Sequence, residues 1–429
     1  MYRLAYYLTK IPDGKNVLLA QGMNGEIVRI GKGKFNAVLR HLNSKGAPEI
    51  EKAKSGLLKR LIIVPKTWTL KQEQNLMKTF FLGGCQAPLD SLWLCLTMRC
   101  NFACPYCFQS ENPSDMTEEI ADRALDYYFK EISKNPPKRF TIILYGGEPL
   151  LRQELISHIV KRTKKFCAES GLKGGFSLIT NGSLFSEKTA KLFDGTEVEM
   201  QTTLDGPREA HDKRRFFKGG AGSYDRIIAN LPAMLKIAKR VYVRVNVDST
   251  NAKKVPELLR ALKRLNRENL RVYFAAVHGH CGRGEGWENR LTRMSIASLR
   301  KTAVGLGLGV IAPGAMRYNL IRCPGSIPKP NCAGADGDLH CCQYFLGKKE
   351  MAVGDVWRGL DEEKLKKWKK MSVAGRPACI RCRYALICGG PCMFQFKSTG
   401  KPNPWCDPKL FASLLLESIR SGAYAVAVV

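Results

Sequence analysis

The chain has 429 residues, enough for two or three domains, and 45% of them are hydrophobic, so it can bury substantial cores. Its 69 Lys and Arg outnumber its 38 Asp and Glu, and the net charge of +31 favours polyanionic partners such as nucleic acid, an anionic membrane or an acidic peptide. Because no signal-peptide core and no run of about 18 apolar residues is present, we expect a cytoplasmic protein without a membrane span.

Residues 1–89 predict a small α+β domain that is winged-helix-like. Two apolar runs flank Asn24-Gly25, a dipeptide typical of a tight hairpin turn. Apolar residues at helical spacing then predict short amphipathic helices over 35–42, 49–61 and 69–81. The region has one cysteine, Cys85, and no catalytic constellation, so we expect an accessory role.

Residues 90–310 alternate apolar runs with helical patterns such as 118–133 and 227–239. The expected strands are 91–98, 139–146, 175–182, 197–206, 241–248 and 270–277. Repeats of strand and helix imply parallel strands joined by right-handed crossovers. The predicted fold is α/β, a partial (β/α)6 barrel of the TIM type, with the active site at the carboxyl ends of its strands.

Residues 311–429 form a third predicted domain that is rich in glycine, proline and cysteine. Helical periodicity fades there until a final pattern over 407–419. Long loops in a compact domain need a stabilising crosslink, which cysteine-ligated metal would supply.

Eleven of the 16 cysteines fall into spaced groups. Cys100, Cys104 and Cys107 follow the first expected strand with the spacing C-x3-C-x2-C. Three thiolates in one loop ligate three irons of a [4Fe–4S] cluster and leave the fourth iron open to a ligand, whereas a fully ligated cluster transfers electrons or stabilises structure. The other eight are Cys323, Cys332, Cys342, Cys379, Cys382, Cys388, Cys392 and Cys406. We therefore expect one reactive cluster and further closed ones.

Two other readings of the cysteines remain. Zinc sites usually take four ligands, so seven cysteines in two spaced runs favour iron–sulfur clusters over zinc. Disulfides need an oxidising compartment, and nothing in the sequence directs the chain to one.

These residues resemble the radical S-adenosylmethionine (SAM) superfamily, and within it the peptide and protein maturases that carry a C-terminal SPASM domain. CNFACPYC is similar to the family's cluster loop, in which an aromatic residue, here Tyr106, packs near the adenine. YGGEPL is similar to the motif that holds the SAM amino group, which implies that role for Gly146, Gly147, Glu148 and Pro149.

The resemblance also implies further contacts with SAM at the ends of later strands. Thr180 and Asn181 would line the pocket, Thr203 would touch SAM, and Arg215 would pair with its carboxylate. Arg214 competes with Arg215 for that role. Arg244 and Asn246 are inward polar residues of the fifth expected strand, where a structural role is equally open.

The C-terminal cysteines resemble those of the SPASM domain. By that resemblance one auxiliary [4Fe–4S] cluster takes Cys323, Cys332, Cys342 and Cys392, and the other takes Cys379, Cys382, Cys388 and Cys406. Cys341 could exchange roles with Cys342. We expect Cys85, Cys95, Cys167 and Cys281 to be free, buried cysteines.

The resemblance implies a reaction in which SAM is cleaved to a 5′-deoxyadenosyl radical that takes hydrogen from a peptide substrate. An electron donor such as flavodoxin or ferredoxin would be needed. Residues 1–89 resemble a domain that binds the leader of a ribosomal precursor peptide by strand addition, and the basic surface would suit an acidic leader or core.

The bond formed is the open question. Sulfatase maturases, which make formylglycine, have an aspartate base directly after the cysteine that matches Cys342, whereas this chain has Gln343. The surrounding residues instead resemble maturases that form thioether crosslinks. The alternatives are formylglycine formation, carbon–carbon or other crosslinking, a SPASM enzyme with a non-peptide substrate and, disfavoured by the SAM motifs, a non-catalytic iron–sulfur protein that binds nucleic acid.

Overall fold

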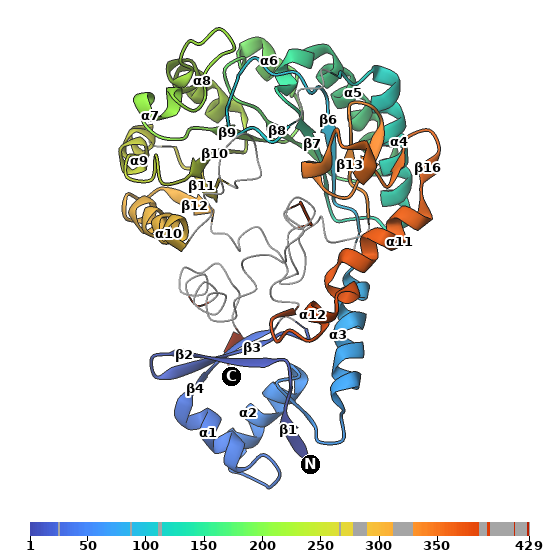
Figure 1. Cartoon of the computed structure of the whole chain (residues 1–429), viewed down its shortest axis with the longest axis vertical. Coiled ribbons are helices and arrows are strands. Elements are labelled where there is room, and N and C mark those ends of the chain that lie inside the picture. Colours follow the sequence, from blue (N-terminus) through green and yellow to red (C-terminus); the bar gives the residue numbers. More distant parts are fainter. Residues whose placement is uncertain are drawn as a thin grey trace. The chain divides into compact units, whose positions relative to one another are not determined.

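The computed structural model describes residues 1–24, 26–85, 88–109, 114–265, 267–277, 290–311, 329–385, 393–394, 416 and 427–428 (Figure 1). The chain forms two compact units. The first, which we call the terminal unit, comprises Met1–Ala87, Ala312–Lys329 and Glu363–Val429; the second, the barrel unit, comprises Pro88–Ile311 and Pro330–Glu362. The division into three domains at residues 89 and 310 stays a prediction.

The barrel unit is built on a run of parallel strands. Each expected strand is present, and the strands are β6 (Ser91–Cys95), β7 (Phe140–Tyr145), β8 (Gly174–Ile179), β9 (Val198–Thr203), β10 (Arg240–Val247) and β11 (Leu270–Ala276). They pair in chain order, and β12 (Gly309–Ile311) adds a further parallel strand beside β11. The predicted α/β fold with parallel strands is confirmed.

Short strands extend the same sheet beyond β6, where the sequence shows no strand periodicity. They are β13 (Cys332–Ala333), β14 (Asp338–His340), β15 (Gly354–Asp355) and β16 (Gly359–Leu360). The first pairs parallel with β6, with Cys332 opposite Trp93, and the others follow antiparallel. Residues 330–362 thus belong to the barrel sheet.

Helices cover the outer face of the barrel strands (Figure 1). They are α4 (Glu118–Lys134), α5 (Gln153–Ser170), α6 (Glu187–Lys191), α7 (Arg208–Asp212), α8 (Tyr224–Ile237), α9 (Val255–Arg264) and α10 (Arg290–Gly305). Side chains alternate across each strand, so the valines of β10, such as Val243, are buried with the helices, while Tyr242, Arg244 and Asn246 face the inside of the barrel. Polar groups at the inner face are therefore available for chemistry.

The terminal unit contains the hairpin that the sequence predicts. Its strands are β2 (Leu8–Asp13), β3 (Asn16–Gln21) and β4 (Ile27–Gly31), an antiparallel sheet in which Leu19 lies opposite Val28; Gly25 lies outside the described residues. β17 (Ala427–Val428) pairs parallel with β4, and β1 (Tyr2–Leu4) pairs antiparallel with β5 (Ile63–Pro65). The last strand of the chain thus completes a sheet begun near its start.

The helices of the terminal unit include those predicted for residues 1–89. They are α1 (Lys32–Arg40), α2 (Pro48–Lys59), α3 (Leu70–Cys85), α11 (Glu362–Met371) and α12 (Pro377–Ile380). Apart from Leu416, the helix expected over 407–419 lies outside the described residues. Within the described ranges, no helix is both long enough and apolar enough to span a membrane.

One hydrophobic core of the terminal unit joins residues from both ends of the chain. Tyr7, Met77 and Phe81 are fully buried there together with Val373 and Ala385. Residues 363–385 therefore pack as part of the fold that residues 1–87 begin.

Candidate active site

The loop that carries Cys100, Cys104 and Cys107 leaves the carboxyl end of β6. Cys100 and Cys104 are half-buried and Cys107 is exposed. Burial, with smaller contributions from Glu148 and from the thiols of Cys104 and Cys107, raises the pKa of Cys100 to about 11. Across the described ranges, no three His, Cys, Asp or Glu side chains are already arranged around a single point as metal ligands.

Gly146 and Gly147, which follow β7, lie against the backbone of the segment that leads into the cysteine loop. The amide of Gly147 donates to the carbonyl of Thr97 at 2.8 Å, and that of Glu148 donates to the carbonyl of Arg99 at 2.9 Å. A Cβ atom at Gly146 or Gly147 would overlap these carbonyl oxygens, and Gly146 has a φ of +151°, which L side chains rarely adopt. The glycines are thus required for the close approach of two backbone segments.

Glu148 is fully buried and joins this segment to the turn after β8. Its carboxylate accepts hydrogen bonds from Thr180 Oγ1 and the Asn181 amide, both at 2.7 Å, and from the Leu150 amide at 3.0 Å. Asn181 in turn donates to Asn101 Oδ1 at 2.7 Å, and its Nδ2 lies 3.9 Å from Cys100 Sγ. Pro149, also buried, begins the short helix η1 (Pro149–Arg152).

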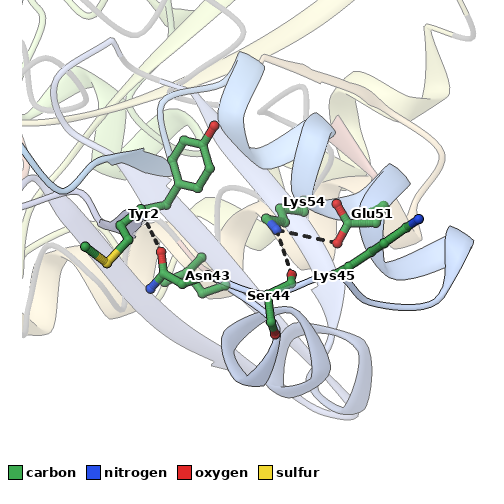
Figure 2. A pocket seen from close by; sticks show the side chains of 8 residues that line it. Tyr2, Asn43, Ser44, Lys45, Glu51 and Lys54 are labelled. Atoms are coloured by element: carbon green, nitrogen blue, oxygen red, sulfur yellow. Dashed lines mark hydrogen bonds and ion pairs between the residues drawn. The ribbon is translucent and has the colours of Figure 1, made fainter.

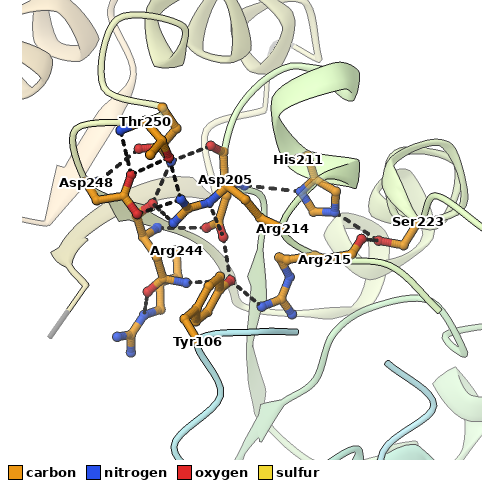
Figure 3. A network of polar contacts seen from close by, with 11 residues as sticks. Tyr106, Asp205, His211, Arg214, Arg215, Ser223, Arg244, Asp248 and Thr250 are labelled. Carbon is orange, nitrogen blue, oxygen red and sulfur yellow. Dashed lines mark hydrogen bonds and ion pairs between the residues drawn. The ribbon is translucent and has the colours of Figure 1, made fainter. Parts of the chain in front are cut away.

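Tyr106 anchors the other side of the cysteine loop to the ends of β9 and β10 (Figure 3). Its hydroxyl donates to the Asp205 carboxylate and accepts from Arg215 Nη1 at 2.8 Å and Asn246 Nδ2 at 3.3 Å. Burial raises the pKa of Tyr106 well above its usual value, so the hydroxyl keeps the proton that it donates.

The structure separates the roles of Arg214 and Arg215. Arg214 pairs with Asp248 at 2.6 Å and with Asp205 at 3.5 Å. Arg215 makes no ion pair with any carboxylate in the described ranges, and its Nε has no hydrogen-bond partner there. Its guanidinium lies over the Phe102 ring, 5.6 Å from the centroid. Burial raises the pKa of Cys104, and the charge of Arg215 opposes that rise, which puts Arg215 beside the cysteine loop.

His211 fixes the backbone around these arginines. The Asp205 amide donates to His211 Nδ1 at 3.2 Å, so Nε2 carries the proton and donates to Ser223 Oγ at 3.0 Å. Ser223 Oγ donates onward to the carbonyl of Arg215 at 2.7 Å. Burial lowers the pKa of His211 to about 3, and the nearby charge of Arg215 adds to that effect, so the ring is neutral in this network.

The part of the chain that contains this site matches a known protein family. Residues 94–262 match the model of the Radical SAM superfamily. They are a radical SAM domain. The cofactors of this domain are a [4Fe–4S] cluster and SAM, and the chain that carries it is an enzyme.

Relatives resemble the chain over most of its length. Pre-heme d1 synthase of Dinoroseobacter shibae is 24% identical over 351 residues, which are 73% of this chain and 83% of that protein. Native anSMEcpe with bound AdoMet and Cp18Cys peptide has a TM-score of 0.62 at 18% identity and covers 78% of this chain and 98% of its own. Streptococcus suis SuiB bound to precursor peptide SuiA has a TM-score of 0.53 at 16% identity and covers 95% and 99%. The two structures share the fold of this chain.

The residues of the radical SAM domain suit its cofactors. Three thiols in one loop are the donor set of a cluster with an open iron. The guanidinium of Arg215, which has no carboxylate partner in the described ranges, stands beside them and suits an anionic group such as the SAM carboxylate. Thr203, the remaining predicted contact, lies at the carboxyl end of β9 with Arg244 as its partner on β10.

The predicted auxiliary ligands occur in both units. Cys332 on β13 and Cys342, just before η3 (Gln343–Phe345), belong to the barrel unit; Cys341 is buried beside them, and burial raises the pKa of Cys332 with a further rise from Cys341 and Cys342. Cys379 and Cys382 belong to the terminal unit, where Cys379 packs against its core. Cys281, Cys323, Cys388, Cys392 and Cys406 lie outside the described residues.

The spare cysteines that are described are free. Cys95 is buried, and Cys167 is half-buried against Gly174. Cys85 ends α3, and its side chain is outside the described part.

Our sequence interpretation missed Asp205, Asp248 and His211. A signal was present, because an aspartate follows each of two neighbouring strands, and the carboxyl ends of parallel strands meet at one edge of a sheet. Asp205 comes two residues after β9, and Asp248 directly follows β10.

A pocket in the terminal unit carries none of this chemistry. It has a volume of about 310 Å³ and lies between the start of the chain and the segment around Ser44 (Figure 2). Lys54 donates to the Ser44 carbonyl at 3.2 Å and pairs with Glu51 at 3.4 Å. Its lining includes no cysteine and none of the predicted site residues.

Proposed function

We propose that this radical SAM enzyme joins a cysteine sulfur to a carbon atom within a ribosomally made precursor peptide. The likeness to the peptide-bound SuiB structure, which spans 95% of the chain, supports a peptide substrate. The terminal unit would bind the leader by adding a strand to the sheet of β2, β3 and β4.

The site residues would divide the work of holding the cofactors. Cys100, Cys104 and Cys107 would ligate the cluster, and Arg215 would pair with the SAM carboxylate. Since the Glu148 carboxylate already accepts three hydrogen bonds, its part would be to position Asn181 and the backbone of the Gly146–Pro149 motif around the amino group of SAM. The bound cluster and SAM supply a 5′-deoxyadenosyl radical that removes one hydrogen atom from a substrate carbon.

Closing the thioether requires an electron acceptor. The peptide would first give one hydrogen atom to the 5′-deoxyadenosyl radical, which leaves a radical on the substrate carbon. As the thiol sulfur bonds to that carbon, one proton and one electron would leave the peptide. The electron returns to the protein, which balances the one used to cleave SAM. Two auxiliary clusters, held by Cys323, Cys332, Cys342 and Cys392 and by Cys379, Cys382, Cys388 and Cys406, would carry it.

The observation that carries this choice is Gln343, directly after Cys342. An amide cannot take up a proton as the aspartate of sulfatase maturases does. The carboxylates at the mouth of the barrel are engaged as well, since Asp205 and Asp248 pair with Arg214 and Glu148 accepts three hydrogen bonds.

Formylglycine formation is the second candidate, because anSMEcpe has the higher TM-score, 0.62 against 0.53 for SuiB. Its product differs in composition, since formylglycine formation from cysteine removes the sulfur.

The test is anaerobic reconstitution with iron and sulfide, followed by SAM, a reductant and any short peptide encoded beside the gene, with mass spectrometry as the readout. 5′-Deoxyadenosine together with a peptide that has lost two hydrogen atoms, and whose fragments join a cysteine to another residue, supports the thioether. Formylglycine formation from serine also removes two hydrogen atoms but leaves every cysteine thiol free. Loss of sulfur from the peptide supports formylglycine, and no 5′-deoxyadenosine contradicts the assignment of the site. A Cys104→Ala sample is the matched control for reactions of SAM that do not need the cluster.

A further inference from the structure

Arg244 is a second guanidinium at the mouth of the barrel that makes no ion pair with a carboxylate in the described ranges. Its Nε donates to Asn246 Oδ1 at 2.8 Å, and its head stands 5.5 Å from the centroid of the Tyr273 ring. In Figure 3 the guanidinium points away from the Asp205, Arg214 and Asp248 ion pairs. The Nη1 and Nη2 atoms are therefore directed to a different part of the site.

That part of the site is bordered by the cysteine loop. Arg244 interacts with Tyr344, and the Tyr344 ring packs against Phe108 with centroids 4.5 Å apart. Phe108 directly follows Cys107, and Tyr344 directly follows Gln343. The Arg244 head thus lies between the inner face of β10 and the two segments that carry predicted cluster ligands.

Burying a guanidinium without a counter-charge costs free energy of folding. Two other arginines near β10 do have carboxylate partners. Arg240 on β10 pairs with Glu199 at 3.1 Å, and Arg214 pairs with two aspartates. Arg244 has no carboxylate partner in the described ranges; Asn246 and the side chain of Tyr344 accept hydrogen bonds from it, and the remaining N–H donors of its planar fork suit a carboxylate. Asn246 holds Nε and so fixes the direction in which the fork points.

Arg215 and Arg244 contact different parts of the site. Arg215 contacts Tyr106 and Phe102 beside Cys104, whereas Arg244 contacts Tyr273 and Tyr344 on the inner face of β10 and β11. We propose that Arg244 binds a carboxylate of the peptide substrate, and thereby selects the segment presented to the radical; this rests on the proposed function. The carboxylate belongs to an Asp or Glu side chain or to the C-terminus of the peptide.

The test uses three short probes and the full chain, reconstituted with clusters and loaded with SAM. The probes are acetyl-Ala-Gly-Glu-Gly-Ala-amide, the same peptide with Gln for Glu, and the Gln peptide with a free C-terminal carboxylate. Binding is measured by anaerobic isothermal titration calorimetry at low salt. A bidentate, charge-assisted contact predicts that one carboxylate probe binds about tenfold more tightly than the amide probe. The probe that shows the preference identifies the source of the carboxylate.

Variants locate the contact. Arg244→Gln is expected to abolish the preference for the carboxylate probe and Arg244→Lys to reduce it, because lysine keeps the charge but loses the fork. The matched control is Arg240→Gln on the same strand, which should keep the preference. Thermal melting of each variant checks folding, and Arg244→Lys decides the question if the glutamine variant does not fold.

Three results would overturn the proposal. The first is that the wild-type chain shows no preference for a carboxylate probe, or no measurable binding of any probe. The second is a preference that persists when Arg244 is replaced. The third is that Arg244→Gln loses as much affinity for SAM as Arg215→Gln does. Failure of the proposed function is distinguishable, because the wild-type chain would then prefer the carboxylate probe while no crosslinked peptide forms.

Discussion

The two ends of strands β9 and β10 carry opposite arrangements of charge. At the amino end, Glu197 pairs with Lys239 at 2.9 Å and Glu199 pairs with Arg240 at 3.1 Å, with every side chain about a third to a half exposed. At the carboxyl end, Asp205 is fully buried, Asp248 and Arg214 are 7% and 12% exposed, and Arg215 and Arg244 have no described carboxylate partner. The amino end is balanced and hydrated, whereas the carboxyl end holds an excess of cations for ligands to balance.

The largest effect that this contrast predicts is at the cysteine loop. Replacing Cys104 with alanine should reduce 5′-deoxyadenosine formation to background, because two thiolates do not hold a cluster with one open iron. Chromatography of the quenched reaction measures the product. Cys167→Ala, far along α5 from the loop, is the matched control, and an equal loss in both variants would mean that the cysteines act through folding.

Arg215 should be the next most sensitive position. Arg215→Gln removes the cation expected to face the SAM carboxylate, and we expect the Kd for SAM to rise on the order of 100-fold. Equilibrium binding of SAM to the reconstituted chain measures it. Arg240→Gln at the amino end should leave the affinity unchanged, and a normal affinity in Arg215→Gln would exclude the assignment.

Breaking the buried ion pair should cost stability. Asp248→Asn leaves Arg214 with only the longer of its two ion pairs, that with Asp205, and the free energy of unfolding should fall by about 3 kcal/mol. The side chains are little exposed, so solvent screening is small. Urea unfolding measures the change, and a loss below about 1 kcal/mol would show that the carboxyl end is no different from the surface.

The neutral His211 should make stability depend on pH. Its pKa falls from 6.5 to about 3 on folding because it is buried, so below pH 6.5 the unfolded chain binds a proton that the folded chain does not. Its stabilising contribution is complete above that pH and is lost as the pH falls, by on the order of 2 kcal/mol at pH 5. Urea unfolding at pH 7 and pH 5 should show a smaller difference for His211→Gln than for the wild-type chain. An identical difference would assign the effect to other groups.

The smallest effect is expected at the amino end. Glu199→Gln removes a hydrated ion pair with Arg240, and stability should change by less than about 1 kcal/mol. The same urea titration makes the comparison direct. A cost as large as that of Asp248→Asn would remove the distinction between the two ends of the strands.

The barrel was predictable because its signals are local. Each strand from β6 to β11 is an apolar run or alternates apolar and polar residues, and the intervening helices carry apolar residues at helical spacing, so these local patterns are enough to find them. The cysteine loop and the Gly146–Pro149 motif were likewise visible as short patterns.

The rest depends on contacts that the order of residues does not reveal. The strands β12 to β16 have only two or three residues each, too few for a periodic pattern, and they form because an edge of the sheet is available. Arg214 and Arg215 are neighbours in sequence, and only the positions of Asp205 and Asp248 distinguish them. The pairing of residues 363–385 with the start of the chain is also non-local.

That pairing sets the order in which a nascent chain can mature. Tyr7, Met77 and Phe81 are synthesised first, but their partners Val373 and Ala385 are made about 300 residues after Phe81, and the strand Ala427–Val428 that pairs with β4 is made later still. The barrel segment from Pro88 to Ile311 is translated in between. The apolar surface of α3 therefore lacks its partners Val373 and Ala385 while the barrel segment is being made. A chain that stops before residue 373 would expose this surface to chaperones and proteases.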